Sequence, residues 1–180
     1  MTPTNTLIVG TSKSKDVDAY YVKSKEKFWG VIFKAGLSDV LLNPSDYAKF
    51  TASTGIGFWD LAYDNIIVDD KTLKEKPEVI LNGLKFFVGI LNSPKAPNRI
   101  AFNGKTAAGW FFYFLDHGKF VKNGNMAFKE IFPNFNYGRL PRSYKDTEIH
   151  VLPNTSGVAS KYWDEECWIK FWKLHIKSNS

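Results

Sequence analysis

Residues 6–16, TLIVGTSKSKD, join an apolar strand to a turn of small residues, and they decide the fold expected for this chain. Junctions of this kind often bind a ligand in α/β proteins, at the carboxyl end of a strand. The glycine spacing and the closing Lys-Ser or Lys-Thr of a phosphate-binding loop are missing, because only Gly10 is present and Lys13 follows Ser12. The stretch therefore predicts a first strand whose carboxyl end binds a ligand by some means other than a phosphate-binding loop.

Alternating strand and helix patterns follow this first strand. The predicted strands are residues 7–10, 55–61, 100–103 and 149–152, and the predicted helices are residues 28–35, 77–91, 106–114 and 162–175. Pro77 suits a first helical turn, and Thr106 is a typical start signal. This alternation predicts one α/β domain over residues 1–180, a three-layer α/β/α sandwich with a central four-stranded parallel sheet.

The segment 117–147 is the least regular part of the chain, rich in Gly, Pro and Asn. We expect a long excursion between the third and fourth strands there. Arg139, Arg142 and Lys145 gather in it, which is typical either of a solvated loop or of contacts to phosphate groups.

Composition limits the class of protein further. The chain has 180 residues, of which 44% are hydrophobic and 16% aromatic, enough to bury a core. We find no apolar run that could span a bilayer and no signal-peptide pattern. Cys167 is the only cysteine, which excludes an internal disulfide and favours a reducing compartment. We expect a cytoplasmic or nuclear protein that is not secreted and not bound to a membrane.

The net charge of +6, carried mostly by lysine, favours a polyanionic partner such as nucleic acid. Charge alone is a weak signal, because many small proteins are equally basic.

Polar residues follow each predicted strand, at the edge where parallel sheets bind ligands. Asp60 ends the second strand, Asn103 ends the third, and residues 153–157 follow the fourth. This edge offers no set of Cys and His ligands, so we expect no metal site. A triad of Ser12, His150 and Asp60 is conceivable but unsupported, since Gly-x-Ser-x-Gly is absent and His150 lies inside a strand.

An ordered set of motifs spans nearly the whole chain. It comprises KFWGVIFKAGLSD (27–39), NGKTA (103–107) and VLPNTSGV (151–158). The set resembles the uracil-DNA glycosylase superfamily, most closely its mismatch-specific (Mug/thymine-DNA glycosylase) branch. YYVKSKEKFW (20–29) is similar to a segment of the hypoxanthine-DNA glycosylase branch. The resemblance implies a monomer without a cofactor that binds double- or single-stranded DNA and holds a base flipped out of the stack.

The resemblance also implies roles for particular residues. Tyr21 falls where the family stacks the base, with a plain core aromatic as the alternative. Asn103 would read the base edge, or else cap a turn. The implied base pocket is Gly10, Thr11, Ser12, Tyr20, Tyr21 and Asn103. The implied DNA contacts are Lys13, Asn154, Thr155, Ser156, Gly157, Lys161, Arg139, Arg142 and Val158, the last as an apolar wedge.

The catalytic group departs from the family pattern. Ser12 stands where the mismatch-specific branch has its water-positioning Asn, and Glu26 stands where the hypoxanthine branch has one. Excision needs a group that activates water and groups that stabilise the leaving anion. Glu26 is the first candidate for the water, with Asp16 and Asp60 behind it. The alternative for Glu26 is a solvated charge that favours a helix start.

Three functions remain open at this point. The favoured one is a glycosylase that hydrolyses the N-glycosidic bond of a damaged, mismatched or modified base, uracil-type above all. The second is a catalytically weakened family member that only binds DNA. The third is a domain for a small ligand or a protein partner, with the aromatic stretches 109–117 and 167–175 as an interface rather than core.

Overall fold

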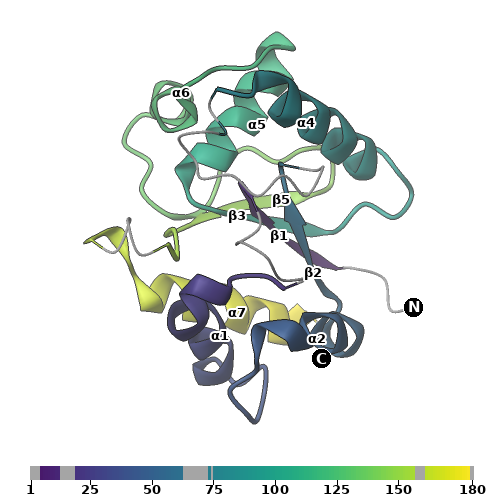
Figure 1. The fold of residues 1–180 in the computed structure, drawn as a ribbon, viewed down its shortest axis with the longest axis vertical. Helices are drawn as coiled ribbons and strands as arrows, with labels where there is room; N and C mark the ends of the chain where they lie inside the picture. The colour runs from purple at the N-terminus through teal and green to yellow at the C-terminus, as the bar shows by residue number, and fades with distance from the viewer. Residues whose placement is uncertain (1–4, 13–18, 63–72, 74, 157–160, 179–180) are drawn as a thin grey trace.

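The computed structural model describes residues 5–12, 19–62, 73, 75–156 and 161–178, with side chains up to residue 176. Its centre is a five-stranded sheet in the order β2-β1-β3-β5-β4 (Figure 1). Four strands run parallel, namely β1 (Thr6–Gly10), β2 (Ile56–Asp60), β3 (Arg99–Asn103) and β5 (Glu148–Leu152). The short β4 (Gly138–Arg139) pairs with β5 in the antiparallel direction.

The α/β class and all four predicted strands are confirmed, but a sheet of four strands is wrong. The fifth strand is β4, inside the segment that we expected to be irregular. Two residues are too few to produce a periodic pattern, so β4 becomes visible only through its pairing with β5.

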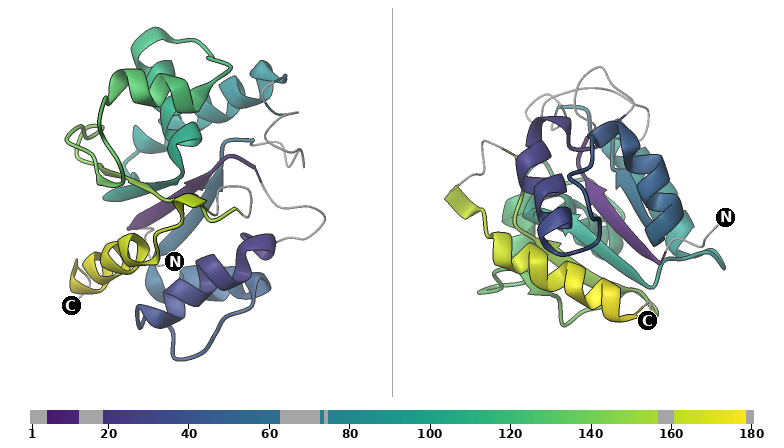
Figure 2. Two further views of the ribbon diagram at one scale, coloured as in Figure 1. Left: turned by 90° about the vertical axis from the view of Figure 1, so that its left-hand side faces the viewer. Right: turned by 90° about the horizontal axis from the view of Figure 1, so that it is seen from below.

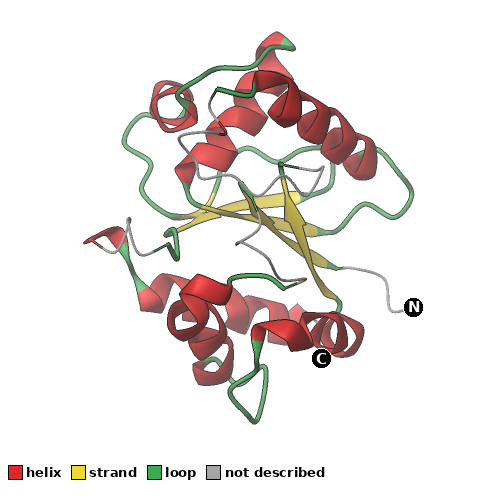
Figure 3. Ribbon diagram, viewed as in Figure 1, coloured by secondary structure: helices red, strands yellow, loops and turns green. Residues whose placement is uncertain are grey.

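Helices cover both faces of the sheet, which gives three layers (Figures 2 and 3). One layer holds α1 (Lys25–Lys34), α2 (Tyr47–Thr54) and α7 (Glu165–Ser178), and the other holds α4 (Pro77–Leu91), α5 (Lys105–His117) and α6 (Gly124–Ile131). Two 3₁₀ turns, η1 (Val22–Ser24) and η2 (Pro44–Asp46), lead into α1 and α2.

The four predicted helices are present as α1, α4, α5 and α7, and Pro77 opens α4 as expected. Thr106 is not the start of α5. The helix begins at Lys105, because Gly104 takes a positive φ of 104° that an L-residue rarely adopts. Among the described helices, none has the length and apolar character needed to cross a membrane.

Alternate residues of the parallel strands build two separate cores. Leu7, Val9, Ile100, Phe102 and Val151 pack on the α4/α5 side, together with buried aromatics of both helices. The opposite face carries Ile8, Ala101 and Leu152 beneath α1 and α7, with Phe28, Trp29, Trp168 and Trp172. Both aromatic stretches therefore contribute mainly to the core, because Trp110, Phe111, Phe112, Trp168, Phe171 and Trp172 are all buried.

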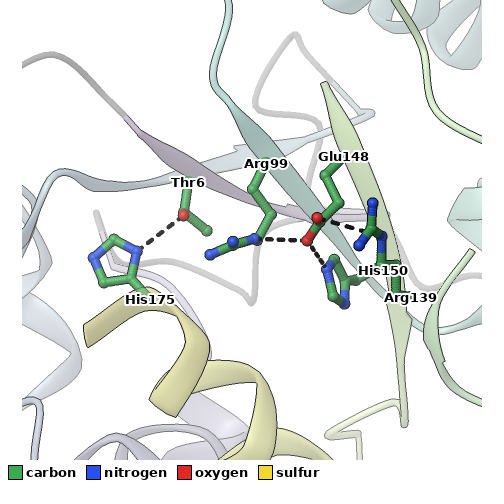
Figure 4. Close-up of polar contacts among 6 residues, drawn as sticks. All are labelled: Thr6, Arg99, Arg139, Glu148, His150 and His175. Carbon is green, nitrogen blue, oxygen red and sulfur yellow. Dashed lines mark hydrogen bonds and ion pairs between the residues drawn. The ribbon is translucent and has the colours of Figure 1, made fainter. Parts of the chain in front are cut away.

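Polar groups near the amino-terminal ends of the parallel strands hydrogen-bond to one another (Figure 4). Arg99 and Arg139 donate to the two carboxylate oxygens of Glu148, at 3.0 and 3.3 Å, and the Nε2–H of His150 donates to the same carboxylate. His150 is only 3% exposed. Its imidazole is hydrogen-bonded to Glu148 within β5, away from the carboxyl ends of the strands, so a nucleophilic triad with Ser12 has no support.

Candidate functional site

Three residues, two of them polar, end neighbouring strands on the face beneath α1 and α7. Gly10 and Asp60 are register partners, and Asn103 ends β3 on the other side of β1. The side chains of Asp60 and Asn103 are almost fully buried, at 9% and 8% exposure. Buried polar groups are costly unless they are paired or used. The carboxyl edge predicted from the topology therefore holds a polar centre.

Gly10 is required by the position of the Asp60 carboxylate. A Cβ at residue 10 would lie 2.4 Å from Asp60 Oδ1 and 3.5 Å from the Tyr21 hydroxyl. The loop after β1 stays beside β2, since the Leu61 and Ala62 amides donate to the Gly10 and Thr11 carbonyls at 3.1 and 2.9 Å. The Asp60 carboxylate and the Tyr21 hydroxyl therefore both lie close to Gly10, where no side chain would fit.

Tyr21 lies over this centre in a strained conformation. Its φ is 59°, in the left-handed region that a bulky residue rarely adopts. Its ring stacks on Phe28 with the centroids 3.9 Å apart, so one face of the ring is already covered. Its hydroxyl is buried and has no hydrogen-bond partner among the described residues. A buried phenol without an acceptor is the kind of group that a ligand satisfies.

The environment keeps this phenol protonated. Burial raises the pKa of Tyr21 well above its usual value, and the negative charge of Asp60 adds to the effect. The Asn103 amide opposes the rise in pKa, but its own hydrogen bonds go to Thr155. Tyr21 is therefore a hydrogen-bond donor at any ordinary pH, close to the carboxyl group of Asp60.

Asn103 fastens the loop that follows β5. Its Nδ2 donates to Thr155 Oγ1 and its Oδ1 accepts from the Thr155 amide, both at 3.0 Å. Trp168 of α7 holds the same loop by donating from Nε1 to the Pro153 carbonyl at 2.8 Å. Asn154 Oδ1 accepts from the Ser156 amide at 2.8 Å. Asn103 thus acts as a turn anchor in the free protein, which was the alternative to reading a base.

The two candidate carboxylates lie in different surroundings. Glu26 is exposed in the first turn of α1, where a negative charge favours the helix start. Asp60 is buried at the end of β2, against Gly10 and close to the Tyr21 phenol. Of the two carboxylates, only that of Asp60 is removed from solvent, and burial of this kind is typical of reactive groups.

Tyr20 packs beside the centre. Its ring stacks on Phe58 at 5.1 Å, and its carbonyl accepts from Trp29 Nε1 at 3.0 Å. Thr11 and Ser12 are partly exposed where the β1 loop leaves the sheet. Lys13, Asp16, Gly157 and Val158 lie outside the described residues.

The two arginines expected on DNA lie elsewhere. Arg142 makes a bidentate pair with Asp116, at 2.6 and 3.0 Å, and Arg139 pairs with Glu148. Because β4 runs antiparallel to β5, the chain after Arg139 leads toward the amino-terminal ends of the parallel strands. The structure therefore does not bring these arginines to the carboxyl edge, while Asn154, Thr155 and Ser156 do lie there.

Sequence reasoning did not single out Tyr137 and Tyr162. Lys105 Nζ lies 4.7 Å from the Tyr137 ring centroid, and Lys161 Nζ lies 4.8 Å from that of Tyr162. The adjacent Lys-Tyr pair at 161–162, directly after the fourth-strand loop, was the available signal. Tyr137 also lines a groove of about 360 Å³ between β4 and α7.

Within the described residues, His, Cys, Asp and Glu side chains form no group of three that could hold a metal ion. The thiol of Cys167 is half-buried, and burial raises its pKa to about 11, which makes it a poor nucleophile. No protein-family model matches the chain, and no curated protein matches it either.

Proposed function

We propose that the protein is a DNA glycosylase, which flips a damaged, mismatched or modified base out of DNA and hydrolyses its N-glycosidic bond. The observation that carries the proposal is the buried pair of Asp60 and Tyr21 over Gly10, at the carboxyl ends of the strands. The ordered motifs of the sequence give the reaction class, and the basic net charge suits a DNA partner.

Base excision needs a group that activates water and a donor that stabilises the departing base. In the proposed reaction, the Asp60 carboxylate takes a proton from a water whose oxygen bonds to the sugar C1′. The N-glycosidic bond breaks, and its electron pair leaves with the base. Tyr21 donates its hydroxyl proton in a hydrogen bond to the base, where negative charge develops. Backbone N–H groups of Thr11 and Ser12 add further donors.

This assignment transfers the water-activating role from Glu26 to Asp60. The burial of Asp60 supports the change, because a carboxylate removed from water interacts more strongly with a reacting group. Glu26 then serves as a comparison residue in the same fold. A protein with this activity would work in the bacterial nucleoid or in a nucleus.

The test is single-turnover cleavage of labelled oligonucleotides, each carrying one uracil, hypoxanthine, mismatched thymine or modified cytosine. Alkali after the reaction converts abasic sites to strand breaks. Breaks that require both the protein and one of these bases are the expected result. Silence across the panel, with salt-dependent DNA binding retained, would instead identify a family member that only binds DNA.

A further inference from the structure

Beside the proposed pocket, two lysines and two tyrosines form a surface that the reaction does not use. We infer that single-stranded DNA binds across Lys105, Tyr137, Lys161 and Tyr162, here called the lysine–tyrosine surface. The inference rests on the proposed function and deepens it, because it names the form of DNA that the site receives.

Each lysine of this surface is held close to an aromatic ring. Lys105 Nζ donates to the Phe135 carbonyl at 3.1 Å and lies 4.7 Å from the Tyr137 ring centroid. Lys161 Nζ lies 4.8 Å from the ring of Tyr162, which is 55% exposed. Tyr137 lines the same groove as Asp164, two residues after Tyr162, which brings the two lysine–tyrosine pairs to one side of the molecule. Tyr162 also affects the pKa of both Tyr137 and Lys105, in agreement with this placement.

The surface adjoins the loop that Asn103 anchors. Lys105 follows Gly104 directly, and a Cβ on Gly104 would lie 3.1 Å from the Asn154 side chain. Tyr137 also lines the groove between β4 and α7, so the surface extends to that groove. A strand whose flipped nucleotide enters the proposed pocket would therefore pass over the lysine–tyrosine surface.

The charges of the surface suit a polyanion. Among the described residues, neither Lys105 nor Lys161 forms an ion pair. Burial lowers the pKa of Lys105, and repulsion from Lys129 lowers it further. The carboxylates after Tyr162 already have partners: Asp164 accepts from the Cys167 amide at 3.0 Å, Glu165 pairs with Lys34 at 2.8 Å, and Glu166 pairs with Lys170 at 3.0 Å.

An exposed aromatic ring beside a lysine favours single strands over duplexes, and Tyr162 is the exposed ring of this surface, while Tyr137 is half-buried. Stacking on an aromatic side chain contributes to binding whatever the base, but a base inside a duplex has no free face. Flipping also costs least when the target base is not paired. The lysines alone would bind any phosphate chain, so the exposed ring of Tyr162 carries the preference for single-stranded DNA.

The test is fluorescence anisotropy with a labelled oligothymidylate of about 15 nucleotides, alone and annealed to its complement. Tyr162→Ala should weaken single-strand binding about tenfold and duplex binding less than about twofold. Tyr162→Phe keeps the ring and should bind as the wild type does. Phe33→Ala is the matched control, because Phe33 is 45% exposed on α1 and lies outside this surface.

The inference is overturned if Tyr162→Ala binds the single strand normally, or if Tyr162→Phe loses as much affinity as Tyr162→Ala. Competition by polyglutamate as strong as that by oligothymidylate would assign the surface to an acidic protein partner. Tighter binding of oligouridylate would assign it to RNA. Tyr162-dependent binding without excision of any base would overturn only the proposed function, and excision with Tyr162-independent binding would overturn only this inference.

Discussion

Tyr21 has its backbone in the left-handed region, and its buried hydroxyl lies near Asp60 but makes no hydrogen bond to the described residues. A left-handed tyrosine costs roughly 1–3 kcal/mol, which the surrounding packing must offset. The stack on Phe28 supplies part of that packing. The sequence predicted an aromatic ring at this position, but a tyrosine in this conformation leaves no signal in residue patterns.

Removing the Tyr21 hydroxyl should separate stability from activity. In Tyr21→Phe the free energy of unfolding should stay equal or rise by up to about 1 kcal/mol, because a buried hydroxyl without a partner is removed. Excision should fall at least about tenfold, because the donor to the leaving base is lost. Urea unfolding and single-turnover rates measure the two effects. A less stable protein with unchanged excision would contradict the role of Tyr21.

A side chain at residue 10 should displace the carboxylate of Asp60. In Gly10→Ala the new Cβ meets Asp60 Oδ1 at 2.4 Å, so excision should fall about a hundredfold and stability by about 2 kcal/mol. Gly89→Ala is the control, since a Cβ there meets nothing within 4 Å in an exposed part of α4. It should leave excision unchanged and stabilise the protein slightly. Normal excision by Gly10→Ala would remove Asp60 from the mechanism.

At the scale of elements, the loop after β5 depends on one side-chain pair. In Thr155→Val the Nδ2 of Asn103 loses its acceptor while the amide bond to Oδ1 remains, which should cost about 1–3 kcal/mol. Thr155→Ser keeps the hydroxyl and should recover most of that stability. Thermal and urea unfolding of the three proteins check this. Equal stability of Thr155→Val and the wild type would mean that the pair does not anchor the loop.

Helix α7 is tied to β1 and to the end of α2 through His175. Its Nε2–H donates to the Thr54 carbonyl at 3.1 Å, and its Nδ1 accepts from the Thr6 hydroxyl at 3.0 Å. Burial lowers the pKa of His175 below 6.5, and burial lowers that of His150 in the same direction. The unfolded chain therefore binds these protons first as the pH falls.

The free energy of unfolding should consequently decrease as the pH falls below about 6.5, before the carboxylates titrate. His175→Gln should flatten this dependence, leaving the part due to His150. Urea titrations between about pH 7.5 and pH 5.5 measure the slope. Stability that is constant or rises toward pH 5.5 in the wild type would contradict the neutral, buried state of both histidines.

Elements with long patterns could be predicted, and short ones could not. The 15 residues of α4 could be predicted from their helical periodicity, and the parallel strands from their apolar runs. The eight-residue helices α2 and α6 each bury few side chains, and β4 has only two residues. These three elements depend on tertiary contacts rather than on local preference.

At the scale of the whole molecule, topology predicted the edge that holds the candidate site, and burial ranked the candidate residues. Parallel strands have their carboxyl ends at one edge of the sheet. The alternation of strand and helix patterns in the sequence was enough to predict this edge. Glu26 ranked above Asp60 because local sequence does not show which carboxylate is buried. Arg139 and Arg142 were expected at that edge, but the antiparallel direction of β4 takes them elsewhere.

The most direct test compares two isosteric variants, Asp60→Asn and Glu26→Gln, in single-turnover excision of whichever base the wild type removes. Both carboxylates become amides of the same size, so packing changes little. Asp60→Asn should lose at least about a hundredfold in rate, and Glu26→Gln should stay within about twofold of the wild type. Normal excision by Asp60→Asn, or loss confined to Glu26→Gln, would contradict a glycosylase built on the buried strand-end carboxylate.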